Sequence, residues 1–394
     1  MLSARAPLIF LIAGEVSGDL LGGRLMASLR SREPRITFAG VGGERMAEQG
    51  LESLFPMSDL AVMGLAEVLP RLPLLLGRMG EAAAAIRRLR PDAVVTIDAP
   101  DFAFRVAKRV RGLGIPLIHY VAPTVWAWRP GRARKIARFL DHLLALLPFE
   151  PPYFEREGLP CTFVGHPVVE GGAGRGHAAR FRAAHGLPEG APLLCVLPGS
   201  RRGEVERLLP VFEAALGRLV PRHPGLRAVV PTVGPVRDRV ARAIGDWPVP
   251  TVLVEGEEAK FDAMAASTAA LAASGTVALE LALAGVPAVI AYRMAPLTMA
   301  LARRLVRVRY VNLVNLMLDR GLVPELLQED CTPERIEAEL ERLLIDPEAR
   351  RAQTEGAAEV ARWLGREGQP PADRAAEAVL AAMRRGPRFP ARNA

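Results

Sequence analysis

The chain has 394 residues, of which 50% are hydrophobic and 24% are charged, and its formal net charge at pH 7 is +8. This length exceeds one ordinary hydrophobic core, so we expect two domains, and a small disulfide-held scaffold is excluded. Three widely separated cysteines argue against both a disulfide framework and a zinc cluster, and they favour the cytosol as the compartment. The basic balance indicates an anionic partner, which charge alone leaves open between nucleic acid, a phosphorylated small molecule and an acidic lipid surface.

The first elements have the rhythm of an α/β domain. The apolar run at 7–13 breaks into the charged segment GEVSGD, which predicts a buried strand rather than a signal peptide. Near-continuous hydrophobic strands separated by helices, such as 20–30 and 80–90, predict a doubly wound parallel sheet. Its strands are expected at 8–12, 93–98, 116–121 and 143–147.

The most apolar long window is LAVMGLAEVLPRLPLLLGRM at 60–79. Pro70, Pro73 and three charged residues interrupt it too often for a membrane span. It is either a pair of core helices or an exposed apolar patch that contacts a bilayer from the side. The residues alone favour the core helices.

A glycine-rich segment, VEGGAGRGHAA at 169–179, predicts a linker. We therefore expect a first domain at 1–168, a second at 180–345 and C-terminal helices at 346–394, which include a helix at 372–385. Two doubly wound halves joined by a hinge imply a cleft, with ligands at the carboxyl ends of the strands. The strands of the second sheet are expected within 192–201, 226–233, 251–256, 269–274 and 287–293.

Two strand-loop-helix junctions in the second half are of the phosphate-binding type. In the first, CVLPGSRRGEVERL, Gly199 allows a tight turn, Ser200 can cap the helix, and Arg201 can contact a phosphate through two hydrogen bonds. Many such junctions only cap a helix. This one is neither a Walker loop nor a dinucleotide fingerprint.

The second junction is AASGTVALELALAGVP. Ser274, Gly275 and Thr276 open a helix, and Glu280 stands one turn beyond Thr276 on the same face. Together the two junctions suit a diphosphate held by the loops and a ribose held by the carboxylate. The sequence has no D-x-D pair and no H-E-x-x-H pattern, so it predicts a site without a metal or another cofactor.

Acidic side chains also follow strands of the first half. Asp98 and Asp101 lie directly after the strand in VTIDAPDF, where a carboxylate can act as a general base on an acceptor hydroxyl. Glu15, Ser17 and Asp19 follow the first strand in AGEVSGD. In each case an Asx turn or a helix cap is the alternative.

The stretch HYVAPTVWAWRPGRARK at 119–135 combines aromatic and cationic residues. Trp126 and Trp128 beside Arg129 suit an amphipathic anion with an apolar body, although both rings could be ordinary core residues. Nucleic acid is a rival, because bases stack on tryptophan, but these aromatics are clustered rather than spread along a basic groove. A second cationic run, LARRLVRVRY at 301–310, is either a further anion contact or a solvated helix face.

Taken together, these motifs resemble the lipid-A-disaccharide synthases, which are inverting glycosyltransferases of family 19 with the GT-B fold. The resemblance implies two Rossmann-like domains that face each other across a cleft, with C-terminal helices returning to the first. It also implies transfer of 2,3-diacylglucosamine from its UDP derivative to the 6-hydroxyl of 2,3-diacylglucosamine 1-phosphate. The matching pieces, from residue 13 to residue 328, are AGEVSGD, LAVMGLAEVL, IDAPDF, HYVAPTVWAWRPGR, FVGHP, LPGSRRGEVE, SGTVALE, YRM and VNLVNLMLDRGLVPELLQ.

The resemblance also assigns roles to residues. Asp98 matches the proposed base of the family, and Ala103 and Val314 depart from its pattern, which has asparagine and proline there. UDP is expected to contact Gly199, Ser200, Arg201, Ser274, Gly275, Thr276, Glu280, Asn315 and Gln328. The acceptor is expected to contact Glu15, Ser17, Asp19, Asp101, Trp126, Trp128 and Arg129.

Family members act peripherally at the inner face of the inner membrane, so contact with an anionic membrane surface and no binding of nucleic acid are expected. This favours a membrane role for 60–79. A homodimer with exchanged C-terminal segments is a further expectation. The enzymatic alternatives are a UDP-N-acetylglucosamine 2-epimerase and a peptidoglycan N-acetylglucosaminyltransferase, and the alternative from another class is a basic nucleic-acid-binding protein without catalysis.

Overall fold

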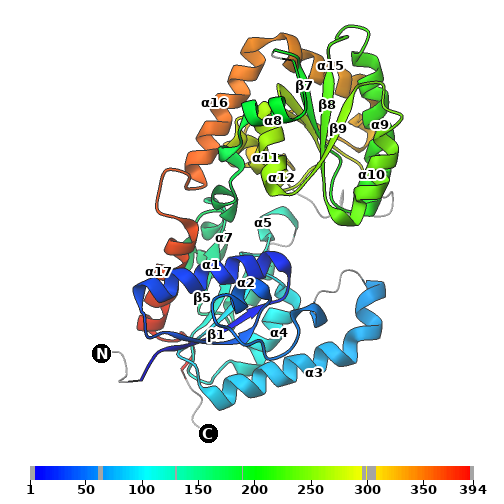
Figure 1. Ribbon diagram of the computed structural model, residues 1–394. Coiled ribbons are helices and arrows are strands. Elements are labelled where there is room, and N and C mark those ends of the chain that lie inside the picture. The colour runs from blue at the N-terminus through cyan, green and yellow to red at the C-terminus, as the bar shows by residue number, and fades with distance from the viewer. Residues whose placement is uncertain are drawn as a thin grey trace. The chain divides into compact units, whose positions relative to one another are not determined.

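The computed structural model describes residues 5–60, 65–128, 131–188, 190–294, 299 and 308–390, without the side chains of 65–69 and 128. The chain forms two compact units (Figure 1). The first consists of Met1–Pro167 with Gly368–Ala394, and the second of Val168–Glu367. Each has its own parallel sheet of six strands covered by helices, so the predicted α/β architecture is confirmed.

The sheet of the first unit has the strand order β2-β1-β3-β4-β5-β6. Its strands are β1 (Leu8–Ala13), β2 (Thr37–Val41), β3 (Ala93–Ile97), β4 (Leu117–Tyr120), β5 (His142–Ala145) and β6 (Cys161–Phe163). The helices are α1 (Val16–Arg32), α2 (Glu44–Ala47), α3 (Leu65–Leu89), α4 (Pro100–Val110), α5 (Val125–Trp128), α6 (Gly131–Ala137), α7 (Pro151–Glu155) and α17 (Pro371–Arg385).

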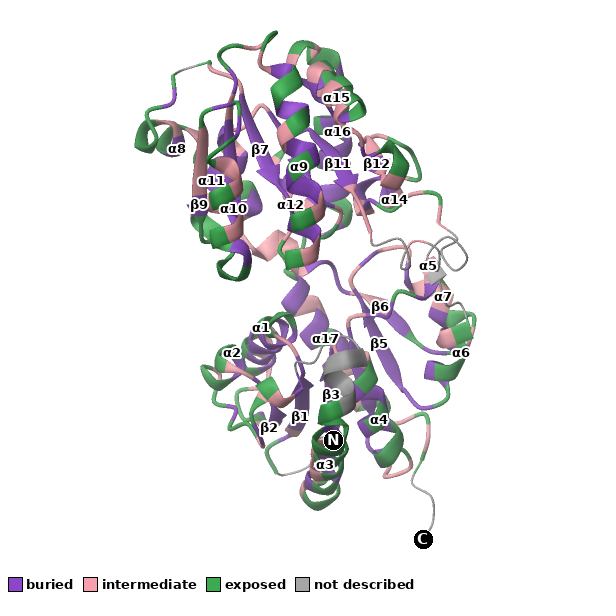
Figure 2. Cartoon of the chain, turned by 90° about the vertical axis from the view of Figure 1, so that its right-hand side faces the viewer, coloured by how far each residue is buried: buried purple, intermediate pink, exposed green. Residues whose placement is uncertain are grey.

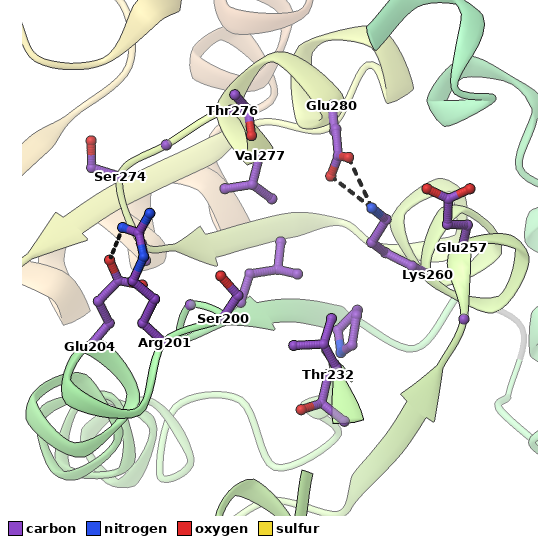
Figure 3. A pocket seen from close by; sticks show the side chains of 17 residues that line it. Ser200, Arg201, Glu204, Thr232, Glu257, Lys260, Ser274, Thr276, Val277 and Glu280 are labelled. Carbon is purple, nitrogen blue, oxygen red and sulfur yellow. Dashed lines mark hydrogen bonds and ion pairs between the residues drawn. The ribbon is translucent and has the colours of Figure 1, made fainter. Parts of the chain in front are cut away.

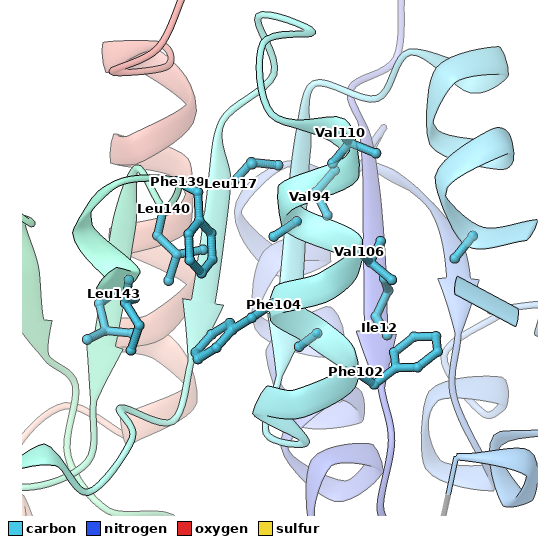
Figure 4. Close-up of a cluster of buried hydrophobic side chains, with 14 of the residues drawn as sticks. Ile12, Val94, Phe102, Phe104, Val106, Val110, Leu117, Phe139, Leu140 and Leu143 are labelled. Atoms are coloured by element: carbon cyan, nitrogen blue, oxygen red, sulfur yellow. The ribbon is translucent and has the colours of Figure 1, made fainter. Parts of the chain in front are cut away.

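Side-chain alternation along β1 gives this sheet two buried faces. Phe10 and Ile12 point into one apolar cluster, which includes α4 and part of α3 and is drawn in Figure 4. Leu11 and Ala13 point into another, which includes α1 and α17. Because both faces are covered, the central strands β1, β3, β4 and β5 are almost wholly buried, and Figure 2 shows most of their length as buried.

The sheet of the second unit has the order β12-β11-β10-β7-β8-β9. Its strands are β7 (Leu193–Leu197), β8 (Arg227–Thr232), β9 (Thr251–Glu255), β10 (Ala269–Ala272), β11 (Ala288–Tyr292) and β12 (Glu325–Leu327). The helices are α8 (Ala178–Ala184), α9 (Arg202–Leu219), α10 (Arg237–Ile244), α11 (Glu257–Ala266), α12 (Val277–Ala284), α14 (Leu313–Leu318), α15 (Pro333–Ile345) and α16 (Pro347–Trp363).

Two segment boundaries differ from the sequence expectation. The expected linker at 169–179 contains a short 3-10 helix at Ala173–Arg175 that packs on α11 and α12, so it is part of the second unit. A Cβ on Gly176 would lie 2.0 Å from the carbonyl oxygen of Phe261, so this glycine serves close packing rather than flexibility. At the other end, α16 packs within the second unit, and the chain joins the first unit at Gly368 rather than at 346.

The apolar window at 60–79 lies largely in α3, so the expectation of two core helices is wrong. Leu75 and Met79 are buried, while Leu72, Leu74 and Leu76 are 37%, 41% and 42% exposed. Leu72 and Leu76, one turn apart, share a face of α3, and Leu74 lies on the other side of the helix. We call these three exposed leucines together the α3 leucine strip. In the described parts of the chain, no helix combines the length and the apolar character that crossing a membrane requires.

Candidate functional site

A cavity of about 590 Å³ opens in the second unit at the carboxyl ends of β7, β8, β9 and β10. Figure 3 shows it with the side chains that line it. Both predicted phosphate-binding junctions contribute to its wall, as the sequence analysis expects from their positions after strands. From these junctions the lining includes Gly199, Ser200, Arg201, Ser274, Gly275, Thr276 and Glu280.

The first junction requires its glycine. Gly199 has φ +110°, which favours glycine, and a Cβ there would lie 2.9 Å from Oε2 of Glu204. Arg201, rather than the expected Ser200, is the N-cap residue of α9, without a side-chain cap. The Arg201 side chain is 67% exposed, and its Nη1 donates a hydrogen bond to Oε1 of Glu204 (3.2 Å). A cation at the N-terminus of α9 therefore lines the cavity, an arrangement that suits an anion.

Glu204 is a lining residue that the sequence analysis did not select. It is 9% exposed and also accepts a hydrogen bond from the hydroxyl of Tyr292 (2.9 Å). Burial, together with the bond to Glu204, raises the pKa of Tyr292 above its usual range. Glu204 thus ties Arg201 to the end of β11, a tertiary contact that no local motif encodes.

The second junction leads into α12, with Thr276 as the N-cap residue. Glu280 points into the cavity from the first turns of this helix. Both of its carboxylate oxygens accept from Nζ of Lys260, at 2.9 and 3.1 Å. Lys260, from α11, is a second lining residue that the sequence analysis missed, because the segment EGEEAK resembles no binding motif.

The other two expected donor contacts do not line the cavity. Asn315 is 1% exposed, and its side chain bonds to the segment before β12 and to β12 itself. Its Nδ2 donates to the carbonyl oxygen of Val323 and to Oε1 of Glu325, both at 2.7 Å, and its Oδ1 accepts from two backbone amides. Gln328 has φ +53° and accepts from the backbone amide of Met294 (3.3 Å). Both residues fix loops next to β11 and β12.

In the first unit, the chain is strained where two neighbouring strands end. Asp98 and Ala99, after β3, have φ +53° and +42°, and Val121, after β4, has φ +82°. Such values are costly for residues with a Cβ, and they concentrate at functional sites. Oδ2 of Asp98 accepts from the hydroxyl of Ser17 (3.2 Å), and Oδ1 accepts from the amide of Ala99 (3.0 Å). Two of the predicted residues, Asp98 and Ser17, are therefore in contact.

The remaining acidic candidates of this unit, Asp19, Asp101 and Glu15, have other surroundings. Asp19 is buried, and its carboxylate accepts from the amides of Gly43, Arg45 and Met46 at 2.8 to 3.1 Å, so it holds the start of α2. Asp101 has a fully exposed side chain, with Nη2 of Arg132 at 3.9 Å. Glu15 is the N-cap residue of α1.

The tryptophan-rich stretch is anchored by a buried carboxyl group. Nε1 of Trp126 donates to Oε1 of Glu150 (3.2 Å), and the Trp126 ring meets that of Phe149 edge to face, with centroids 5.3 Å apart. The amides of Leu146 and Leu147 donate to Oε2 of Glu150. Burial raises the pKa of Glu150 to about 7, although these hydrogen bonds oppose the rise.

The structure describes only some of the other residues in the two cationic runs. The side chain of Trp128, the whole of Arg129 and the run at 301–307 lie outside the described residues. His119 is buried against Thr96 and Phe104, and burial lowers its pKa to about 3, so it is neutral. Among the residues that the structure describes, no three His, Cys, Asp or Glu side chains are grouped so as to hold a metal ion.

Comparison with known proteins gives concordant matches. The family model for lipid-A-disaccharide synthetase matches residues 9–379. The chain is 67% identical over 376 residues to the lipid-A-disaccharide synthase of Rhodospirillum centenum, covering 95% of this chain and 94% of that one. It is 51% identical over 384 residues to the protein of the same name from Paramagnetospirillum magneticum, covering 96% and 98%.

Solved structures share the fold at low sequence identity. A UDP-GlcNAc 2-epimerase from Neisseria meningitidis, bound to UDP-GlcNAc, gives a TM-score of 0.62 at 13% identity and covers 96% of this chain and 100% of its own. MurG from Acinetobacter baumannii gives 0.58 at 16% identity, covering 96% and 99%. At such identities the likeness supports the two-unit α/β fold alone.

Proposed function

The chain belongs to the lipid-A-disaccharide synthase family, and on this basis we propose that it condenses UDP-2,3-diacylglucosamine with 2,3-diacylglucosamine 1-phosphate. The products are UDP and a β-1,6-linked disaccharide 1-phosphate of lipid A biosynthesis. The observation that carries this proposal is a cavity in a chain of this family whose lining suits a nucleoside diphosphate. Two helix-opening junctions, the guanidinium group of Arg201 and the carboxylate of Glu280 meet in it.

The cavity is the proposed donor site. The diphosphate accepts hydrogen bonds from the amides at the starts of α9 and α12, and Arg201 leaves Glu204 to pair with it. The ribose hydroxyls donate to the carboxylate of Glu280. This places the developing negative charge of the leaving UDP beside fixed amide dipoles and a guanidinium group, which lowers the barrier to its departure.

Asp98 is the proposed general base. The 6-hydroxyl oxygen of the acceptor attacks the anomeric carbon, the bond from that carbon to the β-phosphate oxygen breaks, and the hydroxyl proton moves to the carboxylate. Oδ2 of Asp98 accepts only a weak bond from Ser17, and the strained backbone at Asp98 and Ala99 fixes where the carboxylate stands. A single displacement of this kind inverts the anomeric configuration.

We also propose that the protein contacts the inner face of the inner membrane through the α3 leucine strip. Acylated substrates reside in a bilayer, and Leu72, Leu74 and Leu76 expose apolar surface on one helix. The net charge of +8 favours an anionic surface. Partition onto vesicles that contain anionic lipids tests this contact.

The proposed homodimer exchanges α17 between two copies. Within one chain α17 packs on α1, where Ser28 and Arg32 each donate to Asp373, at 2.6 and 2.9 Å. The whole second unit separates α17 from the rest of the first unit in sequence, so the same contacts suit the α17 of a second copy. Light scattering measures the mass in solution, and a monomer at all concentrations would contradict the exchange.

The test is an assay in detergent, with a chelator present, that follows UDP and disaccharide together from the two acylated substrates. We expect equal amounts of both products. Asp98→Asn should lower kcat by about 10² or more with little change in the Kd for UDP, because Asp98 lies in the first unit and the cavity in the second. Arg201→Ala should weaken UDP binding by about tenfold or more.

Asp246→Asn is the matched control, because this exposed carboxylate precedes β9, at the opposite end of the sheet from the cavity. Turnover of unacylated UDP-N-acetylglucosamine without the acylated pair would favour an epimerase. Salt-sensitive binding of oligonucleotides with no response to UDP would favour a nucleic-acid-binding protein.

A further inference from the structure

The charged side chains labelled in the cavity include two internal ion pairs on opposite sides (Figure 3). Arg201 pairs with Glu204 on one side, and Lys260 pairs with Glu280 on the other. The first pair involves a cation with an expected role toward the diphosphate. Lys260 has no such role, yet it is one of only three lysines in the chain.

The geometry of the second pair is specific. Nζ of Lys260 lies 2.9 and 3.1 Å from the two carboxylate oxygens of Glu280, so the ammonium group bridges both. The side chains are only 22% and 21% exposed, and they come from different helices, α11 and α12. Nζ also lies 4.6 Å from the centroid of the Phe261 ring. The pair is therefore held from several sides, unlike a solvated surface pair.

We propose that Lys260 is a positioning residue for the nucleoside part of a UDP-sugar: it holds the Glu280 carboxylate in the orientation that accepts the ribose hydroxyls. This inference rests on the proposed function, in which the cavity binds the donor. A free glutamate side chain samples many rotamers, and fixing one of them on binding costs conformational entropy. The ammonium group fixes the carboxylate before the nucleotide arrives, so that cost does not weaken binding.

Charge gives a second reason for the pair. Glu280 is an anion in a cavity that must accept an anionic diphosphate, and Glu257 adds another carboxylate to the lining. The ammonium group of Lys260 offsets the charge of Glu280 without occupying the space where the diphosphate junctions lie. Removal of the ammonium should therefore weaken the binding of UDP.

The experiment is calorimetric titration of the full-length protein with UDP and with 2′-deoxy-UDP. For the wild type we expect the missing hydroxyl to weaken binding by about tenfold, the range for a hydrogen bond to a charged group. Lys260→Met should weaken UDP binding by about tenfold and shrink the deoxy effect to about twofold, because the carboxylate is no longer oriented. At saturating donor, kcat should stay within about twofold of the wild-type value, because Lys260 affects how tightly the donor binds and not the reaction of the bound donor.

A double-mutant cycle separates positioning from direct contact. If Lys260 acts through Glu280, adding Lys260→Met to Glu280→Gln should change the Kd for UDP by less than about twofold. The double variant also leaves no charge unpaired, so it remains informative if the single variant folds poorly. Lys260→Arg should restore binding to within about threefold of the wild type, and Lys108→Met, on the exposed face of α4, should change nothing.

Equal Kd values for the wild type and Lys260→Met, with an unchanged deoxy effect, would overturn the inference. So would a full loss of affinity when Lys260→Met is added to Glu280→Gln, because Lys260 would then contact the nucleotide itself. Failure of the wild type to bind UDP at all would instead overturn the proposed function, and the inference with it.

Discussion

Replacement of Glu150 by glutamine should change how the stability of the first unit depends on pH. The Glu150 carboxyl group is 4% exposed and joins the segment after β5 to Trp126 in α5. Burial raises its pKa from 4.5 to about 7, because the charged form loses its hydration. The folded protein therefore binds a proton that the unfolded chain releases at lower pH.

The sign and size of the effect follow from that difference. Between about pH 4.5 and pH 7 the folded state holds more protons than the unfolded state, so the free energy of unfolding falls as pH rises and levels off above about pH 7. At about 1.36 kcal/mol for each unit of pKa, the loss amounts to about 3 kcal/mol. Glutamine does not titrate, so the stability of the wild type relative to Glu150→Gln should fall by up to about 3 kcal/mol between pH 5 and pH 8.

Hydrogen exchange of the Leu146 and Leu147 amides, which donate to this carboxyl group, provides the assay. Their opening free energies are compared between wild type and variant at pH 5, 6, 7 and 8, which avoids assuming one cooperative transition for two units. Glu155→Gln, at an exposed position of α7, is the matched control and should give the same difference at every pH. A difference for Glu150→Gln that is also independent of pH would refute the reasoning.

Three further predictions concern the cavity, a buried hub and the surface. Gly199→Ala should lower the free energy of unfolding by about 1–3 kcal/mol and weaken UDP binding, because φ is +110° and the new Cβ would meet Glu204. Thermal unfolding measures the first effect, and titration with UDP measures the second. Asn315→Ala should lower the free energy of unfolding by about 3 kcal/mol, because it leaves buried backbone groups unpaired, and the folded variant should still bind UDP. The double change Leu74→Ser and Leu76→Ser should reduce sedimentation with anionic vesicles while activity in detergent persists, and unchanged sedimentation would exclude the α3 leucine strip as the contact.

The interior of both sheets could be predicted from the sequence, and most of the edges could not. The predicted strands include all the central ones, whose residues are buried on both faces and give continuous apolar runs. The missed strands β2, β6 and β12 all lie at sheet edges, and two of them have only three residues. An edge strand is partly solvated, so its sequence carries a weaker hydrophobic signal.

Local motifs located the wall of the cavity but not the contacts that cross it. Ser274 and Arg201 could be found because each sits in a recognisable turn after a strand. Lys260 and Glu150 act on residues from other elements, and nothing in their own neighbourhood indicates the partner. Asp19 is the opposite case: its residue type and position suggest a functional site, but its carboxylate accepts hydrogen bonds from the backbone amides at the start of α2.

The strained backbone beside Asp98 in the first unit is a feature that the structure shows and the sequence motif does not. Asp98, Ala99 and Val121 take positive φ at the ends of β3 and β4, although glycine would adopt those angles without cost. The amide of Asp98 donates to the carbonyl oxygen of Tyr120, and that of Val121 to Leu144, so the sheet holds both strand ends in place. Strain of about 1–3 kcal/mol at each residue persists only where the surrounding structure enforces it. Since β-branched Val121 is the costliest of the three, the chain keeps these strand ends fixed beside Asp98 at the expense of stability, as the proposed role of Asp98 as a general base would require.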